Sequence, residues 1–250
     1  MTFPQFADKH LHEPLFTPED YLKYRKIKIV DFPRNILFVY RQKLERYFIK
    51  KYKPKKIKLA GMMDLLVYKD IGVVRMKGIG APHAITVFEE LIGMGGKLFL
   101  NIGTAGGLHK YGLFVCDKAL RDEGTSHHYL ANNKFSYPDN NLTELFQKHL
   151  SEIGLNFTVG STWTIDAPYR ETKQEVEQYS KEGISTVEME ASALFAVAKY
   201  RNVKISSAFV VSDVLGKKWN PKFNNFDVEK AQRSLLDASV SFLIKQKVKL

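Results

Sequence analysis

The sequence predicts an α/β fold in which helices cover both faces of a central sheet. Short runs rich in β-branched and aromatic residues alternate along the chain with amphipathic segments of helix length. Such alternation is typical of α/β domains. No repeat, low-complexity tract or Pro/Gly/Ser-rich linker divides the 250 residues. We therefore expect one domain over residues 1–250, in which residues 1–34 form an N-terminal extension ahead of the first strand.

The first half of the chain carries clear strand and helix patterns. "NILFVY" at 35–40 predicts a buried strand, and 41–51 predicts the helix that follows it. "LLVYKD" and "IGVVRM" predict a hairpin that bends at 70–72. Pro82 suits the first turn of a helix, which should continue through "HAITVFEELIGM" with apolar residues at helical spacing.

The second half of the chain continues the alternation. "KLFLNI" predicts a strand that leads into a glycine-rich turn, "GTAGGL". "STVEMEASALF" at 185–195 begins as a strand and passes into a small, apolar segment typical of a helix. Further helices are expected at 142–153, 172–181 and 227–246, and further strands near 156–161 and 204–213.

Composition narrows the class of protein. The formal net charge of +11 means that the chain attracts anions over a distance. The basic stretch "KKYKPKK" at 50–56 is compatible with a nucleic-acid patch, but a solvated helix end broken by Pro54 is the interpretation we favour. The single cysteine, Cys116, cannot form an internal disulfide, and no secretory signal or membrane-length apolar run is evident. We expect a cytoplasmic protein that has neither a membrane nor nucleic acid as its partner.

The most unusual residues follow three of the predicted strands, in "NIGTAGG", "TVEME" and "VVSDV". In sheets covered by helices, ligands usually bind where the carboxyl ends of the strands meet. The small residues of 101–108 offer backbone N–H groups that could hold an anion, and Thr104 offers a hydroxyl. "GIGAP" at 78–82 lacks the third glycine of a dinucleotide fingerprint, because His83 stands there.

The acidic residues at these strand ends have two interpretations each. Glu188 and Glu190 would reach one pocket if the strand continued to 190, whereas on a helix their side chains would diverge. Alternatively, Glu190 begins a helix and interacts with the helix dipole. Asp213 either caps a following turn or acts as a buried acid. From the residues alone these alternatives stay open.

Several kinds of chemistry are not indicated. The histidines form no His-Glu-x-x-His motif and no cluster with cysteine, and the adjacent His127 and His128 cannot easily share a metal ion. We therefore expect no metal. The absence of a Gly-x-Ser-x-Gly motif makes a serine hydrolase an unfavoured interpretation.

Taken together, "GIGAP", "IGTAGGL", "RDEGTSHHY", "VEMEASALF" and "VVSDV" resemble motifs of the nucleoside phosphorylase family. That family includes uridine phosphorylase, the hexameric purine nucleoside phosphorylases and the methylthioadenosine nucleosidases. Their order and spacing are similar from about Asn35 to the C-terminus. The resemblance implies a three-layer αβα sandwich with a central mixed sheet, and an enzyme that cleaves the N-glycosidic bond of a nucleoside. It implies no cofactor, with phosphate as co-substrate.

The resemblance also implies roles for individual residues. Glu190 would accept hydrogen bonds from the ribose 2′ and 3′ hydroxyls, and Asp213 would be the general acid that protonates a purine base. The expected substrate-binding residues are Met189 on the sugar, Gly103, Thr104 and Lys43 on the acceptor side, Val187, Tyr169 and Arg170 near the base, and His10 or His12 from a partner subunit at the ribose 5′ hydroxyl. A homo-oligomer, either a dimer or a hexamer built from dimers, is implied.

This chain departs from the family pattern where phosphate would bind. The family's "GDP-x-R" turn reads "VYRQK" here, with Lys43 at the arginine position, and Asn101 replaces a second arginine. An asparagine at that position resembles the hydrolytic nucleosidases, which however carry a glutamate where Lys43 stands. Because Lys43 keeps a cation there, we expect phosphorolysis, with a purine preferred over uridine. A hydrolytic nucleosidase and a non-catalytic nucleotide or nucleic-acid binding protein are the alternatives.

Overall fold

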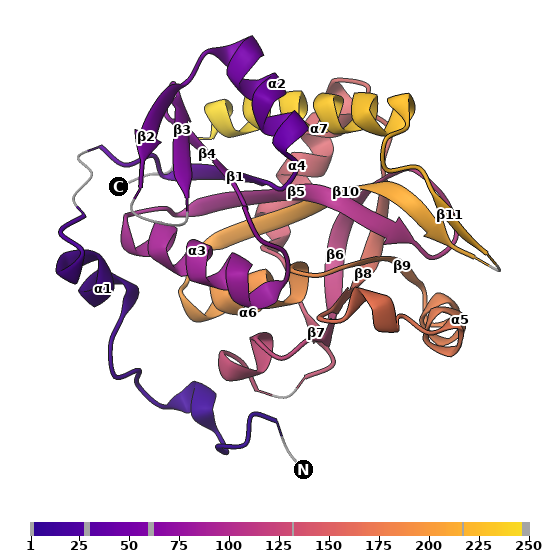
Figure 1. Ribbon diagram of the computed structural model, residues 1–250, viewed down its shortest axis with the longest axis horizontal. Coiled ribbons are helices and arrows are strands. Elements are labelled where there is room, and N and C mark those ends of the chain that lie inside the picture. The colour runs from indigo at the N-terminus through magenta and orange to yellow at the C-terminus, as the bar shows by residue number, and fades with distance from the viewer. Residues whose placement is uncertain (1–2, 28–30, 60–62, 132, 217, 247–250) are drawn as a thin grey trace.

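The computed structural model describes residues 3–27, 31–59, 63–131, 133–216 and 218–246. Within these ranges the strands form one mixed sheet in the order β11-β10-β6-β8-β9-β5-β1-β4-β3-β2, with β7 paired to β6 (Figure 1). The strands are β1 (Asn35–Val39), β2 (Lys55–Lys58), β3 (Asp64–Tyr68), β4 (Ile71–Arg75), β5 (Leu98–Gly107), β6 (Leu113–Asp122), β7 (Phe135–Ser136), β8 (Thr158–Ile165), β9 (Ile184–Glu188), β10 (Lys204–Leu215) and β11 (Trp219–Pro221).

Helices cover both faces of this sheet, which confirms the predicted three-layer architecture. The α-helices are α1 (Pro18–Tyr24), α2 (Gln42–Tyr52), α3 (Ala81–Gly93), α4 (Asn140–Glu152), α5 (Lys173–Lys181), α6 (Ala191–Tyr200) and α7 (Phe226–Lys245). In Figure 1, α2, α4 and α7 lie above the central strands, while α3 and α6 lie below them. One buried core contains Phe48, Phe146 and Phe242 from the first group, and a second contains Phe88 and Phe195 from the other.

The sheet closes on itself at one end, and this closure positions the site. β5 pairs in parallel with both β1 and β10, and it also meets β9 in antiparallel pairing. Since β10 pairs with β6, β6 with β8 and β8 with β9, these strands return to β5. The C-terminal part of β5 therefore lies between β9 and β10 and is one of the strands of a small closed, barrel-like ring.

The predicted helices and most of the predicted strands are confirmed, but the prediction of a glycine-rich turn after "KLFLNI" is wrong. Residues "GTAGG" continue β5 as far as Gly107 rather than leaving the sheet. The reason is close approach between neighbouring strands, because a Cβ on Gly106 would lie 2.9 Å from Cγ1 of Val187. Glycine is thus needed for packing rather than for a turn.

Other elements were not predicted. β6, β7, β11, α1 and β2 lay in segments for which no element was proposed. α2 ends at Tyr52 as expected for a helix end ahead of Pro54, but the basic stretch then enters β2 at Lys55. α1 belongs to the N-terminal segment and packs against α3, where Leu22 lies under Gly93. Across the described ranges, no helix has both the length and the apolar composition required to cross a bilayer.

Candidate active site

Glu190 lies at the junction between β9 and α6. It is the residue before the first turn of α6 and is only 8% exposed. Its Oε1 accepts a hydrogen bond of 2.6 Å from the backbone N–H of Gly80, the residue that precedes α3. Among the described residues, its second oxygen, Oε2, takes part in no hydrogen bond. One carboxylate oxygen is thus fixed by the protein, and the other is available to a ligand.

Glu188 has a different environment from Glu190. Its Oε2 accepts hydrogen bonds from the backbone N–H groups of Glu190 at 2.8 Å and Ala191 at 2.7 Å. Its Oε1 accepts a hydrogen bond of 2.5 Å from Thr164, whose hydroxyl oxygen also accepts the N–H of Ser192 at 3.0 Å. Glu188 therefore satisfies the N–H groups at the start of α6, where a carboxylate also interacts favourably with the helix dipole.

The two carboxyl groups share a buried environment. Burial raises the pKa of Glu188, and the neighbouring Glu190 raises it further. Burial also raises the pKa of Glu190, while the nearby backbone N–H groups of Gly80 and Met189 oppose this shift. In the part of the chain that the structure describes, neither carboxylate forms an ion pair with a lysine or arginine. Each carboxyl group therefore keeps its proton to a higher pH than a carboxylate paired with a cation would.

Tyr40 is the neighbour of these acids that the sequence did not reveal. Burial raises the pKa of its hydroxyl well above the usual value, and the charges of Glu190 and Glu188 add to that shift. The hydroxyl donates to Oδ1 of Asn101 at 2.9 Å, and Nδ2 of Asn101 donates to Ser207 at 3.2 Å. The ring lies over Gly103, where a Cβ would be 3.3 Å from it. A hydrogen-bonded series of uncharged side chains, Tyr40, Asn101 and Ser207, thus lies near the end of β1, where we expected a cation.

The register of the sheet brings the other motifs together. On β5, Gly106 pairs with Val187 of β9 on one side and with Asp213 of β10 on the other. A Cβ on Gly106 would lie 3.6 Å from Oδ2 of Asp213, which shows how close these strands are. Thr104, two residues earlier, pairs with Val210 and is partly exposed. The strand ends that we expected to converge do lie in adjacent positions.

Asp213 is held firmly by its neighbours. It is 8% exposed, its Oδ1 accepts a hydrogen bond of 2.9 Å from Ser212, and its Oδ2 accepts one of 2.8 Å from the indole N–H of Trp219. Glu171 is a second acid here that sequence reasoning missed. Burial raises the pKa of Glu171 to about 7, with further contributions from Asp213 and Glu175. Only the folded structure reveals this pairing, since the acids are far apart in sequence.

Other expected residues have different surroundings. Met189 does lie near the site, because a Cβ on Gly80 would be 3.9 Å from its Cε. Lys43, however, is on the outer face of α2, with its side chain 59% exposed and its Nζ 2.6 Å from Glu229 of α7. The helices α2 and α7 pack together there, so Glu229 neutralises the cation that we expected to face phosphate.

The remaining expected residues lie at the surface. Tyr169 is fully exposed, because the 3₁₀ turn Pro168–Arg170 carries it outward. Arg170 lines a separate open cavity of about 360 Å³ whose acidic neighbours are Asp122, Asp166 and Glu175. His10 and His12 are in the N-terminal segment, where His12 packs edge-on against Phe6. Within one chain, none of these side chains contacts Glu190, so their predicted roles stay predictions.

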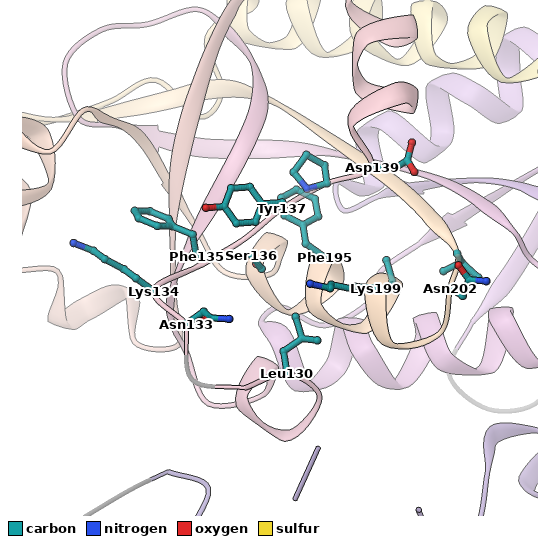
Figure 2. Close-up of a pocket in the computed structure, with 13 residues that line it drawn as sticks. Leu130, Asn133, Lys134, Phe135, Ser136, Tyr137, Asp139, Phe195, Lys199 and Asn202 are labelled. Carbon is teal, nitrogen blue, oxygen red and sulfur yellow. The ribbon is translucent and has the colours of Figure 1, made fainter. Parts of the chain in front are cut away.

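The structure has a cavity elsewhere that contains none of the predicted residues. It measures about 570 Å³ and lies between residues 130–139 and the C-terminal half of α6. Figure 2 shows Tyr137 beside Phe195, with Lys199 further along the helix and Asn202 just past its end. Glu190 is at the opposite end of α6. This cavity is therefore separate from the site around Glu190.

Comparisons with known proteins agree on one family. The sequence matches the model described as "Phosphorylase superfamily" over residues 68–243. It is 30% identical over 173 residues to an uncharacterized protein of Acanthamoeba polyphaga mimivirus, covering 63% of this chain and 67% of that protein. It is 32% identical over 139 residues to a guanosine phosphorylase of Halorubrum lacusprofundi, covering 54% of this chain and 57% of that protein.

A solved structure is similar over a greater length. The crystal structure of an AMP nucleosidase from Bacteroides thetaiotaomicron superposes with a TM-score of 0.76 at 19% identity, covering 92% of this chain and 97% of that one. At this identity the likeness shows the fold alone.

Proposed function

Because the chain belongs to the phosphorylase superfamily, we propose that it cleaves the N-glycosidic bond of a nucleoside and that Glu190 holds the ribose. The observation that carries this proposal is the geometry of Glu190. Its carboxylate is buried, its Oε1 is fixed by the N–H of Gly80, and its Oε2 has no partner among the described residues. Such an oxygen suits the vicinal hydroxyls of a ribose, which are hydrogen-bond donors.

The chemistry of the reaction needs an anion at this place. Cleavage of a glycosidic bond passes through a sugar with oxocarbenium character, and a carboxylate that accepts from its hydroxyls stabilises the positive charge. The effect is greater in a buried site than in water, because the local dielectric constant is lower. Glu190 acts in this step as a carboxylate, so the reaction requires its ionised form. Met189 beside Gly80 provides an apolar contact for the sugar.

On the base side, Asp213 pairs with Gly106, whose other neighbour in the sheet is Val187. We propose that it binds the leaving base, with a purine preferred. The guanosine phosphorylase to which the chain is 32% identical acts on a purine nucleoside, and this supports the preference. Each Asp213 oxygen accepts one hydrogen bond from the protein and keeps a lone pair that can face a base.

For the acceptor, we propose water. Phosphorolysis was expected because Lys43 stands at a family arginine position, but Lys43 is paired with Glu229 in the solvent-exposed groove between α2 and α7. Near Glu190, the uncharged side chains of Tyr40 and Asn101 are hydrogen-bonded to each other, while the guanidinium of Arg41 is bound by Gln232 and Asn224. A dianion placed beside two carboxylates needs a cation to offset the repulsion, whereas water does not.

Phosphorolysis is the second candidate, and two observations favour it. The guanosine phosphorylase relative uses phosphate, as its name states. Arg41 also shares a small cavity with Tyr40 and Gly103, and its guanidinium is held by Gln232 at 3.3 Å. That cavity measures about 10 Å³, so phosphate would bind there only after the side chains move.

The experiment is a panel of purine and pyrimidine nucleosides incubated with the protein, with and without phosphate. Free base and sugar phosphate are separated and measured by chromatography. We expect base to be released from a purine nucleoside at the same rate in both conditions, and the Glu190→Ala variant to release at least about 100-fold less. Glu182→Gln, which alters a surface glutamate paired with Lys134, is the matched control.

The outcomes separate the candidates. Release that requires phosphate and yields a sugar phosphate would establish phosphorolysis instead of hydrolysis. Release that is unchanged in a folded Glu190→Ala variant would refute the role of Glu190. A protein that releases no base from any nucleoside would contradict the enzymatic proposal as a whole.

A further inference from the structure

Trp219 makes a contact with Asp213 that the proposed function does not use. The indole N–H donates to Oδ2 of Asp213 at 2.8 Å. The acid is buried, yet the indole is 60% exposed, so the polar edge of the ring points inward and much of the ring remains open. An aromatic ring with one edge bound to a buried acid and its surface accessible is a suitable platform for another flat ring.

The short strand β11 fixes Trp219 in this position. β11 lies beside the end of β10 (Figure 1). The two strands pair antiparallel, in the register Leu215 with Trp219 and Asp213 with Pro221. The next residue, Asn220, has its carbonyl bound by the hydroxyl of Tyr111 at 2.7 Å. Backbone pairing and this side-chain contact therefore hold the strand on which the indole stands.

Packing of the protein itself does not account for the residue. The aromatic ring nearest to Trp219 is that of Phe223, at 6.1 Å between centroids, and Phe223 is itself 42% exposed. Trp163 offers the contrast, since it is fully buried and bonded to Asp122 at 2.8 Å. Trp163 contributes to the core, whereas much of the surface of Trp219 faces solvent.

We propose that Trp219 binds the heteroaromatic base of the substrate and positions Asp213. The ring stacks on the base, and the N–H holds the carboxylate so that the remaining lone pairs of Asp213 face the base edge. This inference rests on the proposed function for its identification of a base as the ligand. It adds a stacking surface and a positioning contact, both from β11, to the base side of the site.

Two substitutions separate the two roles in steady-state kinetics. Trp219→Phe keeps an aromatic ring and removes the N–H, so we expect kcat to fall about ten-fold, the size of one hydrogen bond to a charged group, with little change in KM. Trp219→Gln keeps an N–H donor and removes the ring, so we expect KM to rise by about 10- to 100-fold. Phe226→Ala, at an aromatic residue that is 74% exposed at the start of α7, should change neither constant.

A binding measurement tests the residue without turnover. The chain has two tryptophans, and since Trp163 is buried, a ligand that touches the site should alter the emission of Trp219. We expect saturable quenching of fluorescence, excited near the red edge of tryptophan absorption, on titration with adenine, hypoxanthine or guanine. The quenching should be retained in Phe226→Ala. Because Trp219→Phe removes the reporter itself, binding by the Trp219 variants is measured by isothermal titration calorimetry: Trp219→Phe should bind these bases about as tightly as wild type, and Trp219→Gln about 10- to 100-fold more weakly.

The results distinguish this inference from the proposed function. If wild-type protein releases base but Trp219→Gln has unchanged KM and both proteins bind the bases equally, the role of Trp219 is refuted. If wild-type protein turns over no nucleoside but shows saturable quenching, and Trp219→Gln binds the bases at least about 10-fold more weakly by calorimetry, the proposed reaction fails while the base-binding role of Trp219 stands. The lack of saturable quenching in a protein that does turn over would also overturn the inference.

Discussion

The backbone N–H of Glu190 donates a hydrogen bond of 2.8 Å to the side chain of Glu188, two residues earlier in the chain. This contact separates the tasks of the two acids. Glu188 is the last residue of β9 and binds the N–H groups at the start of α6, while Glu190 turns toward Gly80. The pair therefore does not act as two equivalent carboxylates in one pocket.

The hydroxyl of Thr164 is predicted to be important for stability. It donates to Glu188 and accepts from the N–H of Ser192, and both partners are buried. Thr164→Val keeps the shape and leaves these groups without their partner, so we expect the free energy of unfolding to fall by about 1–3 kcal/mol. Denaturant unfolding measures it, with Thr86→Val, an exposed hydroxyl bonded to Pro82, as control. Equal effects of the two substitutions would contradict the prediction.

The raised pKa of Glu190 predicts a pH dependence of stability. A carboxyl that binds its proton more tightly when folded stabilises the native state below its unfolded pKa, near 4.5, and this contribution is lost as pH rises through the folded pKa. Glu190→Gln cannot lose a proton, and its amide oxygen can still accept from Gly80. Relative to wild type, the variant should therefore gain stability between pH 5 and pH 8.5, by roughly 1.4 kcal/mol per unit of pKa displacement.

Unfolding in urea at pH 5, 7 and 8.5 provides the measurement for both proteins. The difference between them is the informative quantity, because burial also lowers the pKa of His127, His128 and His149, which gives an opposite pH dependence in both proteins. A difference in free energy that stays constant over this range would show that the pKa of Glu190 is not raised.

The exposed pair of Lys43 and Glu229 predicts that Lys43 has little influence on the reaction. The ammonium group is 2.6 Å from Glu229 and its side chain is 59% exposed. Exposed pairs contribute little to stability, so Lys43→Met should leave unfolding nearly unchanged and kcat/KM within about two-fold of wild type. A marked rise in the KM for phosphate in Lys43→Met would restore the role first expected for it.

Tyr40→Phe, which removes the hydroxyl bound to Asn101, should lower kcat by about ten-fold.

Local patterns explain why much of the fold was predictable. The periodicity that distinguishes a strand from a helix depends only on residues close together in the sequence. It therefore located β1, α2, α3 and α6 with small boundary differences. The convergence of "NIGTAGG", "TVEME" and "VVSDV" followed from the rule that ligands bind at strand ends. The register of Gly106 with Val187 and Asp213 confirms that these segments meet.

Long-range pairing explains what the sequence did not reveal. The contact between Tyr40 and Asn101 joins residues 61 positions apart, so the segment "VYRQK" that contains Tyr40 did not reveal it. The glycines of β5 predict a turn from sequence alone, because their need for small size depends on β9 and β10, which come much later in the chain. Lys43 was placed by sequence position alone, and its partner Glu229 is 186 residues away.

The ion pair between Arg201 and Glu89 gives the last prediction. The guanidinium binds the carboxylate through two hydrogen bonds, at 2.7 Å and 3.0 Å, and joins the end of α6 to α3. The two side chains are only 22% and 11% exposed. Arg201→Met would leave Glu89 without its cation, so we expect the free energy of unfolding to fall by about 2 kcal/mol. Lys134→Met, whose lysine is 54% exposed, should have little effect.

The double variant Arg201→Met with Glu89→Leu distinguishes two causes of this loss of stability. If the loss comes from an unpaired, partly buried carboxylate, replacing that carboxylate by an apolar side chain should recover most of the stability. If the loss comes from the packing of the long arginine side chain, the double variant should be no more stable than Arg201→Met alone. Because both residues lie outside the site around Glu190, nucleoside cleavage by the folded variants should match wild type at a temperature where all are native.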